Sequence, residues 1–290
     1  PHLLPAPGQR GRVGRGSADD HGDVARGEEA AGGRALVEAS TVELGRNPAG
    51  LRRLARRTGV HVVATTGHVC EQYWRGALEL EATPERALVF GFVRDLTVGM
   101  DGTDVRAGVI KVGSSLDRVT LTEARVIRAA AVAQQETGAP ITTHTTAGTA
   151  AMEQVRALER AGADLSHVCV GHLDRRLVWE DHLALARTGV FLGYDCIGKE
   201  QYQPDADRVR FILRLVEAGH GRQVLLAGDM ARRRYLGAWG GGPGYGFILG
   251  QFLGRLRAAG LADADADALG GGEPGQLSHL ARRLRTGRRA

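Results

Sequence analysis

Short apolar runs alternate along this chain with amphipathic stretches about 12 to 18 residues long, a pattern typical of strands alternating with helices. The apolar runs predict seven strands, at 35–39, 60–64, 108–112, 140–144, 167–172, 190–194 and 223–229. The amphipathic stretches predict seven helices, at 48–58, 84–96, 121–136, 149–161, 179–188, 206–218 and 245–259.

This regular alternation favours βαβ units and a parallel sheet, and therefore the α/β class. A TIM (β/α)8 barrel needs one strand more and takes roughly 250 residues. The missing first strand would have to end at or before residue 2, so we expect an incomplete first strand. A doubly wound sheet is the alternative, but no glycine-rich phosphate loop directly follows a predicted strand. The glycine-rich run at 240–244 comes ten residues after the last strand and is interpreted as a turn into the final helix.

The two ends of the chain differ from this regular middle. Residues 1–33 are rich in Gly, Arg, Asp and Ala without a clear period, which predicts an irregular N-terminal segment. Residues 34–260 carry the predicted barrel. Residues 261–290 begin with alternating Ala and Asp and end in arginines, which predicts either a poorly specified helix or a flexible tail.

Composition excludes several classes of protein. The apolar fraction of 43% supports a sizeable core, and the formal charge of +5 is modest for 290 residues. The arginines occur in pairs on predicted helices without interleaved aromatic residues, which argues against nucleic-acid binding. Cys70, Cys169 and Cys196 lack metal-type spacing, which argues against a disulfide framework and for a reducing compartment. No apolar run is long enough for a membrane span, and no signal peptide is visible, so we expect a cytoplasmic protein.

Lysine usage singles out one residue. Only two lysines occur, against 36 arginines, and one of them, Lys111, lies inside the apolar strand at 108–112. Lysine is almost never fully buried unless it is paired or liganded. Unlike arginine it loses its proton readily, and the neutral amine does chemistry or binds a metal.

Further reactive side chains follow the predicted strands. In a barrel the catalytic groups gather at the C-terminal ends of the strands. Those ends carry Lys111, His144, His172 and Asp229. A single strand-end histidine is more often structural, and Asp229 alone is as well explained by capping of a turn. Together, two imidazoles, a carboxylate and an amine at four strand ends predict a divalent metal site.

These residues occur in short strings that resemble the phosphotriesterase-like family of the amidohydrolase superfamily, in its phosphotriesterase-related branch. The matching strings lie at 45–48 (Gly-Arg-Asn-Pro), 110–115 (Ile-Lys-Val-Gly-Ser-Ser), 143–145 (Thr-His-Thr), 171–175 (Gly-His-Leu-Asp-Arg), 228–229 (Gly-Asp) and 240–244 (Gly-Gly-Gly-Pro-Gly). No single string is decisive, but their order and spacing are specific.

The resemblance implies a binuclear metal centre, usually of zinc, in the barrel mouth. Lys111 matches the lysine that is carboxylated on its side-chain nitrogen and bridges the ions. His144 and His172 match the ligands of the more exposed ion, and Asp229 matches the ligand of the buried ion that takes a proton from the bridging hydroxide. His2 matches one member of a His-x-His pair whose partner would precede Pro1. A histidine so close to a chain start is otherwise more often at the surface.

Several positions depart from the family pattern. Arg175 stands where several members place a proton-relaying acid, so either Asp174 substitutes or the relay is absent. His68 stands where many relatives place a substrate-contacting aromatic residue, although a loop histidine without a role is an equal expectation. We also expect substrate contacts from Arg175 and, in the loops after the last two strands, from the aromatic residues Tyr194, Tyr235 and Trp239.

The resemblance therefore implies a hydrolase that cleaves a lactone, carboxyl ester, amide or phosphotriester with a metal-activated hydroxide. A lactone, ester or amide is the favoured native substrate. The alternatives are a degenerate member with an incomplete metal site, a mononuclear enzyme and an arginine-rich nucleic-acid-binding protein. The expected partner is a small molecule, with no nucleic acid, no membrane and a homodimer as a possible assembly.

Overall fold

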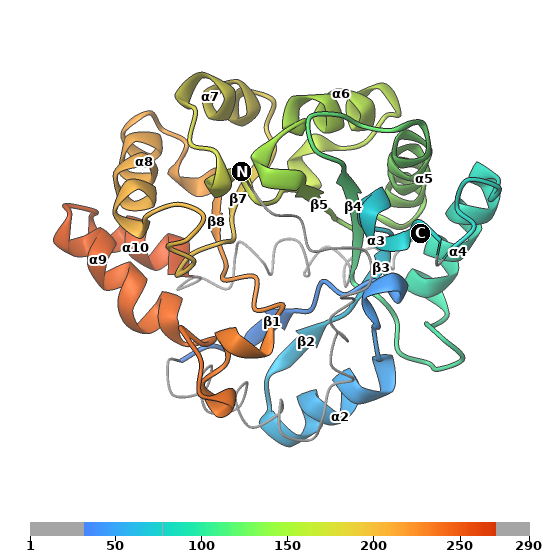
Figure 1. The fold of residues 1–290 in the computed structure, drawn as a ribbon, viewed down its shortest axis with the longest axis horizontal. Coiled ribbons are helices and arrows are strands. Elements are labelled where there is room, and N and C mark those ends of the chain that lie inside the picture. Colours follow the sequence, from blue (N-terminus) through green and yellow to red (C-terminus); the bar gives the residue numbers. More distant parts are fainter. Residues whose placement is uncertain (1–31, 77, 271–290) are drawn as a thin grey trace, which may run out of the picture.

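The computed structural model describes residues 32–76 and 78–270. Its strands form two parallel sheets, one of β1 and β2 and one in the order β3-β4-β5-β6-β7-β8. Figure 1 shows the strands in the interior with helices outside them, which is the arrangement of a TIM-type barrel, as predicted. The strands are β1 (Ala35–Val37), β2 (His61–Val63), β3 (Thr65–Gly67), β4 (Val109–Ser114), β5 (Ile141–Thr145), β6 (Val168–Val170), β7 (Phe191–Tyr194) and β8 (Val224–Leu226).

All seven predicted strands occur, and β3 is an addition. β2 pairs with β1, and β3 pairs with β4, so the chain changes partner at Ala64. The Ala64 carbonyl accepts from the Gly108 N–H at 2.8 Å, and the Thr65 hydroxyl donates to the Glu38 carbonyl at 2.6 Å. These bonds join the two sheets across the break. The predicted first strand, with His2, lies outside the described residues.

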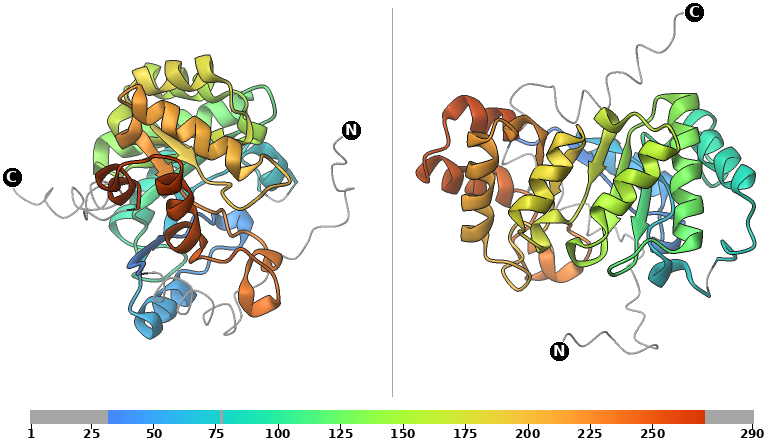
Figure 2. Two further views of the ribbon diagram at one scale, coloured as in Figure 1. Left: turned by 90° about the vertical axis from the view of Figure 1, so that its left-hand side faces the viewer. Right: turned by 90° about the horizontal axis from the view of Figure 1, so that it is seen from above.

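The helices surround the strands (Figures 1 and 2). They are α2 (Pro48–Thr58), α3 (Glu71–Trp74), α4 (Glu85–Thr97), α5 (Leu121–Thr137), α6 (Ala151–Arg160), α7 (Trp179–Arg187), α8 (Asp205–Glu217), α9 (Leu253–Ala258) and α10 (Asp263–Gly270). α2 has its predicted bounds because Asn47 accepts from the Gly50 N–H at 2.9 Å and Gly59 ends the helix in the left-handed region.

The C-terminal part differs from the prediction. The predicted helix at 245–259 begins instead as a π-helical turn at Ile248–Phe252 and continues as α9. Of the two interpretations of the tail, the helix is correct for α10, which buries Ala266 and Leu269. α10 packs against α9 beside α8 (Figure 2). The rest of the tail lies outside the described residues.

The core positions the site because it fixes the central strands. β4 is buried along its whole length, and its apolar side chains pack with the buried face of α5, including Ile127 and Ala130. Successive parallel strands therefore end at one side of the barrel, where the loops carry the candidate residues. Among the described residues, no helix is long and apolar enough to cross a membrane.

Candidate metal centre

Lys111 lies in the middle of β4 and is 8% exposed. Its Nζ is 3.5 Å from the Thr143 carbonyl oxygen on β5, which is a long contact for a hydrogen bond. Among the described residues no carboxylate forms an ion pair with this amine. A buried lysine without an ion-paired carboxylate is unusual, which makes Lys111 a candidate functional residue.

The two predicted ligand histidines meet in front of this strand end. The rings of His144, near the end of β5, and His172, after β6, are 4.6 Å apart between centroids and perpendicular. His144 Nε2 lies 3.2 Å from Thr146 Oγ1, and His172 Nδ1 lies 2.5 Å from Asp195 Oδ1. Each ring thus uses one nitrogen for a neighbour and leaves His144 Nδ1 and His172 Nε2 for a ligand.

The electrostatics of the two histidines suit a metal site. Burial lowers the pKa of His144 well below its usual value, and the charges of His172, Lys111 and Arg175 lower it further. Neutral imidazole is the form that binds metal ions. The pKa of Asp195 is lowered in spite of burial, because its contacts with His172 and the charge of Lys111 outweigh desolvation. Asp195 is therefore an ionised acceptor that fixes the orientation of the His172 ring.

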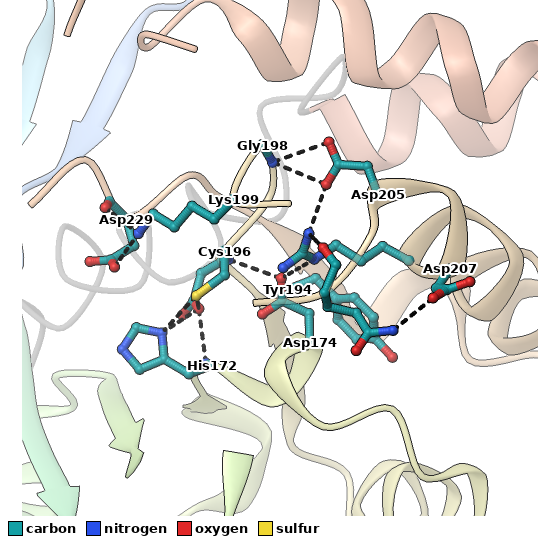
Figure 3. Close-up of polar contacts among 12 residues, drawn as sticks. His172, Asp174, Tyr194, Cys196, Gly198, Lys199, Asp205, Asp207 and Asp229 are labelled. Atoms are coloured by element: carbon teal, nitrogen blue, oxygen red, sulfur yellow. Dashed lines mark hydrogen bonds and ion pairs between the residues drawn. The ribbon is translucent and has the colours of Figure 1, made fainter. Parts of the chain in front are cut away.

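Asp229 follows β8 and has a φ of 43°, in the left-handed region. Its carboxylate forms an ion pair with Lys199, whose Nζ also donates to the Asp229 carbonyl at 2.6 Å (Figure 3). Lys199 is 1% exposed and lies in the loop after β7. It is the second of the two lysines, so the residue count that singled out Lys111 could have found it.

A second close group of metal-type side chains consists of His172, Asp195 and Cys196, whose ligand atoms lie within 4.8 Å of one another. Asp195 Oδ1 already accepts from the backbone N–H and from Nδ1 of His172. Burial raises the pKa of the Cys196 thiol strongly, so it stays protonated and is a poor ligand. This group therefore supports the His172 ring and does not form a separate metal site.

Asp174 does not reach the barrel mouth. Its side chain is fully buried, accepts from Arg208 Nε at 2.7 Å and accepts from the Cys196 N–H at 3.0 Å (Figure 3). Arg208 also binds Asp205 at 2.8 Å. Of the two alternatives for the relay position, this geometry favours an absent relay over substitution by Asp174, because the Asp174 carboxylate binds Arg208 of α8 and the Cys196 N–H. Arg175 instead lies over the ring of Tyr202, 4.3 Å from its centroid.

The four other residues that were predicted to contact substrate lie in different surroundings. Tyr194 is fully buried and packs on the helix layer, with its hydroxyl 2.7 Å from Nδ1 of His182 on α7, so the structure does not bring it to the mouth. His68 is held by Glu43 at 3.2 Å. Tyr235 lies 4.7 Å from Lys199 Nζ, beside the Asp229 ion pair. Trp239 is 39% exposed beneath the Arg233 guanidinium.

Comparison with known proteins shows the family of this chain. The sequence profile of the Phosphotriesterase family matches residues 26–277. The chain belongs to the phosphotriesterase family. A phosphotriesterase homology protein of Escherichia coli K12 is 35% identical over 247 residues, which are 85% of this chain and 84% of that protein. The human N-acetyltaurine hydrolase is 32% identical over 254 residues, which cover 83% of this chain and 72% of that protein.

Solved structures of family members share the fold. A lactonase from Listeria monocytogenes superposes with a TM-score of 0.83 at 30% identity, over 87% of this chain and 83% of the other. The E. coli homologue, solved with phosphate in its active site, gives 0.82 at 33% identity over 86% of each chain. These relatives include named hydrolases, and this member of the family is a hydrolase.

Proposed function

We propose that this phosphotriesterase-family hydrolase uses a binuclear, zinc-like centre held by Lys111, His144, His172 and Asp229. The carrying observation is that both histidines have one ring nitrogen fixed by a neighbour, whereas the other has no hydrogen bond within residues 32–76 and 78–270. His2, which the family pattern adds to this set, lies outside the described residues. Lys111 would contribute as a carbamate, for which its buried amine without a carboxylate partner is suited.

When bound, two divalent ions would lower the pKa of a shared water and polarise the substrate oxygen. The protein residues would supply the rest. Asp229, at the end of β8, would accept the proton of the attacking water, and Lys199 holds its carboxylate in place. Asp195 would keep His172 oriented. Tyr235, next to Lys199, would border the substrate.

We propose a lactone, carboxyl ester or amide as the native substrate, with phosphotriesters as a side activity. The names of relatives support this order, because they include a lactonase and an amide hydrolase. The substrate would be a small molecule, and a homodimer is the assembly that we propose. The three free cysteines support a cytoplasmic location.

Metal content tests the proposal first. Purified protein supplied with zinc and bicarbonate is analysed by plasma mass spectrometry, then assayed on matched lactones, esters, amides and phosphotriesters before and after chelation. Two ions per chain and chelator-sensitive turnover of the acyl substrates are expected. One ion would indicate an incomplete buried site, and none would refute the metal centre. Phosphotriester turnover far above all acyl substrates would reverse the proposed order.

A further inference from the structure

Thr146 lies in the turn that follows β5 and contacts His144 in a way that limits the chemistry of the ring. Its Oγ1 lies 2.8 Å from the Ser114 carbonyl oxygen on β4 and 3.2 Å from His144 Nε2. A carbonyl oxygen only accepts, so the single hydroxyl proton of Thr146 is donated to Ser114. The hydroxyl can then meet His144 Nε2 only as an acceptor.

A third neighbour of the hydroxyl is consistent with this direction. Cys70 Sγ lies 3.8 Å from Thr146 Oγ1. Burial raises the pKa of the Cys70 thiol to about 11, so the thiol carries its proton at neutral pH and can donate. The Thr146 oxygen therefore has one acceptor, Ser114, and two donors, Cys70 and His144, which uses its full hydrogen-bonding capacity.

We propose that Thr146 is a positioning residue that holds His144 as the Nε2–H tautomer and so leaves the Nδ1 lone pair for the metal. His172 is the opposite case, because the Asp195 carboxylate accepts from Nδ1–H and leaves Nε2. The two ligand rings are thus fixed in different tautomers by different partners. This inference rests on the proposed metal centre for its function, but the tautomer belongs to the metal-free protein.

Two variants and one control test the inference. Thr146→Val removes the hydroxyl with little change of shape, and Thr146→Ser keeps it. Thr137→Val is the matched control, because the Thr137 hydroxyl also donates to a carbonyl, of Ala133 at 2.6 Å, and accepts an N–H, of Ala139 at 3.2 Å. Thr137 precedes β5, at the opposite end of the barrel wall from Thr146.

The first readout is nitrogen NMR of metal-free protein with labelled histidine, in which the shifts of both ring nitrogens show where the proton resides. The His144 signals are assigned by their loss in His144→Asn. We expect Nε2–H in the wild type, in Thr146→Ser and in Thr137→Val, and a mixture or Nδ1–H in Thr146→Val. A wild-type His144 with its proton on Nδ1, or an unchanged tautomer in a folded Thr146→Val, overturns the inference.

The second readout is zinc affinity by competition with a chelator. Outer partners of ligand histidines typically affect metal affinity by about 10- to 100-fold, so we expect one ion to bind that much more weakly in Thr146→Val. Thr146→Ser restores the affinity and Thr137→Val leaves it unchanged. Equal affinity in all four proteins contradicts the inference. If even the wild type binds no zinc, the proposed function fails, whereas the NMR result still decides the tautomer.

Discussion

Two groups of buried polar side chains lie within a few residues of each other and behave in opposite ways. In the paired group, Arg208 binds the carboxylates of Asp174 and Asp205, and all three are at most 1% exposed. In the mouth group, which consists of Lys111, His144 and His172, burial lowers the pKa of His144, and the charges of His172 and Lys111 lower it further.

Burial alone therefore does not distinguish a functional group from a structural one here. The paired group consists of opposite charges that join the end of β6, the loop after β7 and α8. The mouth group, Lys111, His144 and His172, has no carboxylate ion-paired to its amine, and His144 Nδ1 and His172 Nε2 have no hydrogen bond among the described residues. Ring nitrogens that have no hydrogen bond among the described residues, and not a perturbed pKa, distinguish the mouth group, because burial also raises the pKa of Asp174 in the paired group to about 6.

The largest effect is expected at Lys111. Lys111→Met keeps the volume of the side chain but cannot form a carbamate, so both metal content and turnover are expected to collapse. A metal centre supplies several kcal/mol of transition-state stabilisation, so kcat/KM should fall by more than about 10³-fold. Thermal unfolding should stay close to the wild type, because no ion pair is lost. Undiminished zinc content in this variant would remove Lys111 from the centre.

For the paired group we expect the reverse, a loss of stability while zinc binding is retained. Arg208→Met removes the guanidinium that the two buried carboxylates share and leaves Asp174 with the Cys196 N–H and Asp205 with the Gly198 N–H as close donors. Loss of one partner of a buried ion pair typically costs about 3–5 kcal/mol of the free energy of unfolding. Urea unfolding measures this loss, and the folded fraction should still bind zinc. The matched control is Arg210→Met on the same helix, whose exposed pair with Asp207 should contribute less than about 1 kcal/mol. Equal stability of the two variants would contradict the distinction between the groups.

Asp195 connects the two groups, because it follows β7 and holds His172. Asp195→Asn keeps the shape but weakens the acceptor for Nδ1–H, so zinc affinity should fall by about 10- to 100-fold. Chelator competition measures the change. Asp181→Asn removes an exposed carboxylate that pairs with Arg176, and its zinc affinity should equal that of the wild type. A change of similar size in both variants would mean that overall charge, and not the His172 contact, is responsible.

Much of the fold is predictable because its signals are local. α2 follows from Asn47, Pro48 and Gly59, and α5 from the capping box of Thr120 and Glu123. β3 was missed because Thr-Thr-Gly has no apolar alternation and is a strand only through its pairing with β4. The π-helical start of the segment before α9 has the same apolar period as an ordinary helix, so the sequence does not show it.

The sequence predicts only those site residues that lie at or near the ends of strands. Lys111, His144 and His172 lie close together because parallel strands bring their ends to one side. Asp195 was missed because it acts through a contact of the loop after β7 that has no sequence period, whereas Lys199, the other of the two lysines, was available from the residue count.

Tyr194 provides the smallest and most specific test, because it ends β7 and was predicted to contact substrate. Its hydroxyl instead meets His182 in the helix layer, so Tyr194→Phe should cost about 1 kcal/mol of stability and leave kcat/KM unchanged. Tyr235→Phe removes a hydroxyl that accepts from Arg234 Nη2 at 3.1 Å, and keeps the ring, whose centroid lies 4.7 Å from Lys199 Nζ. It should lower kcat/KM several-fold with little change in unfolding. The opposite assignment of these two effects would place Tyr194 at the mouth and Tyr235 in the scaffold.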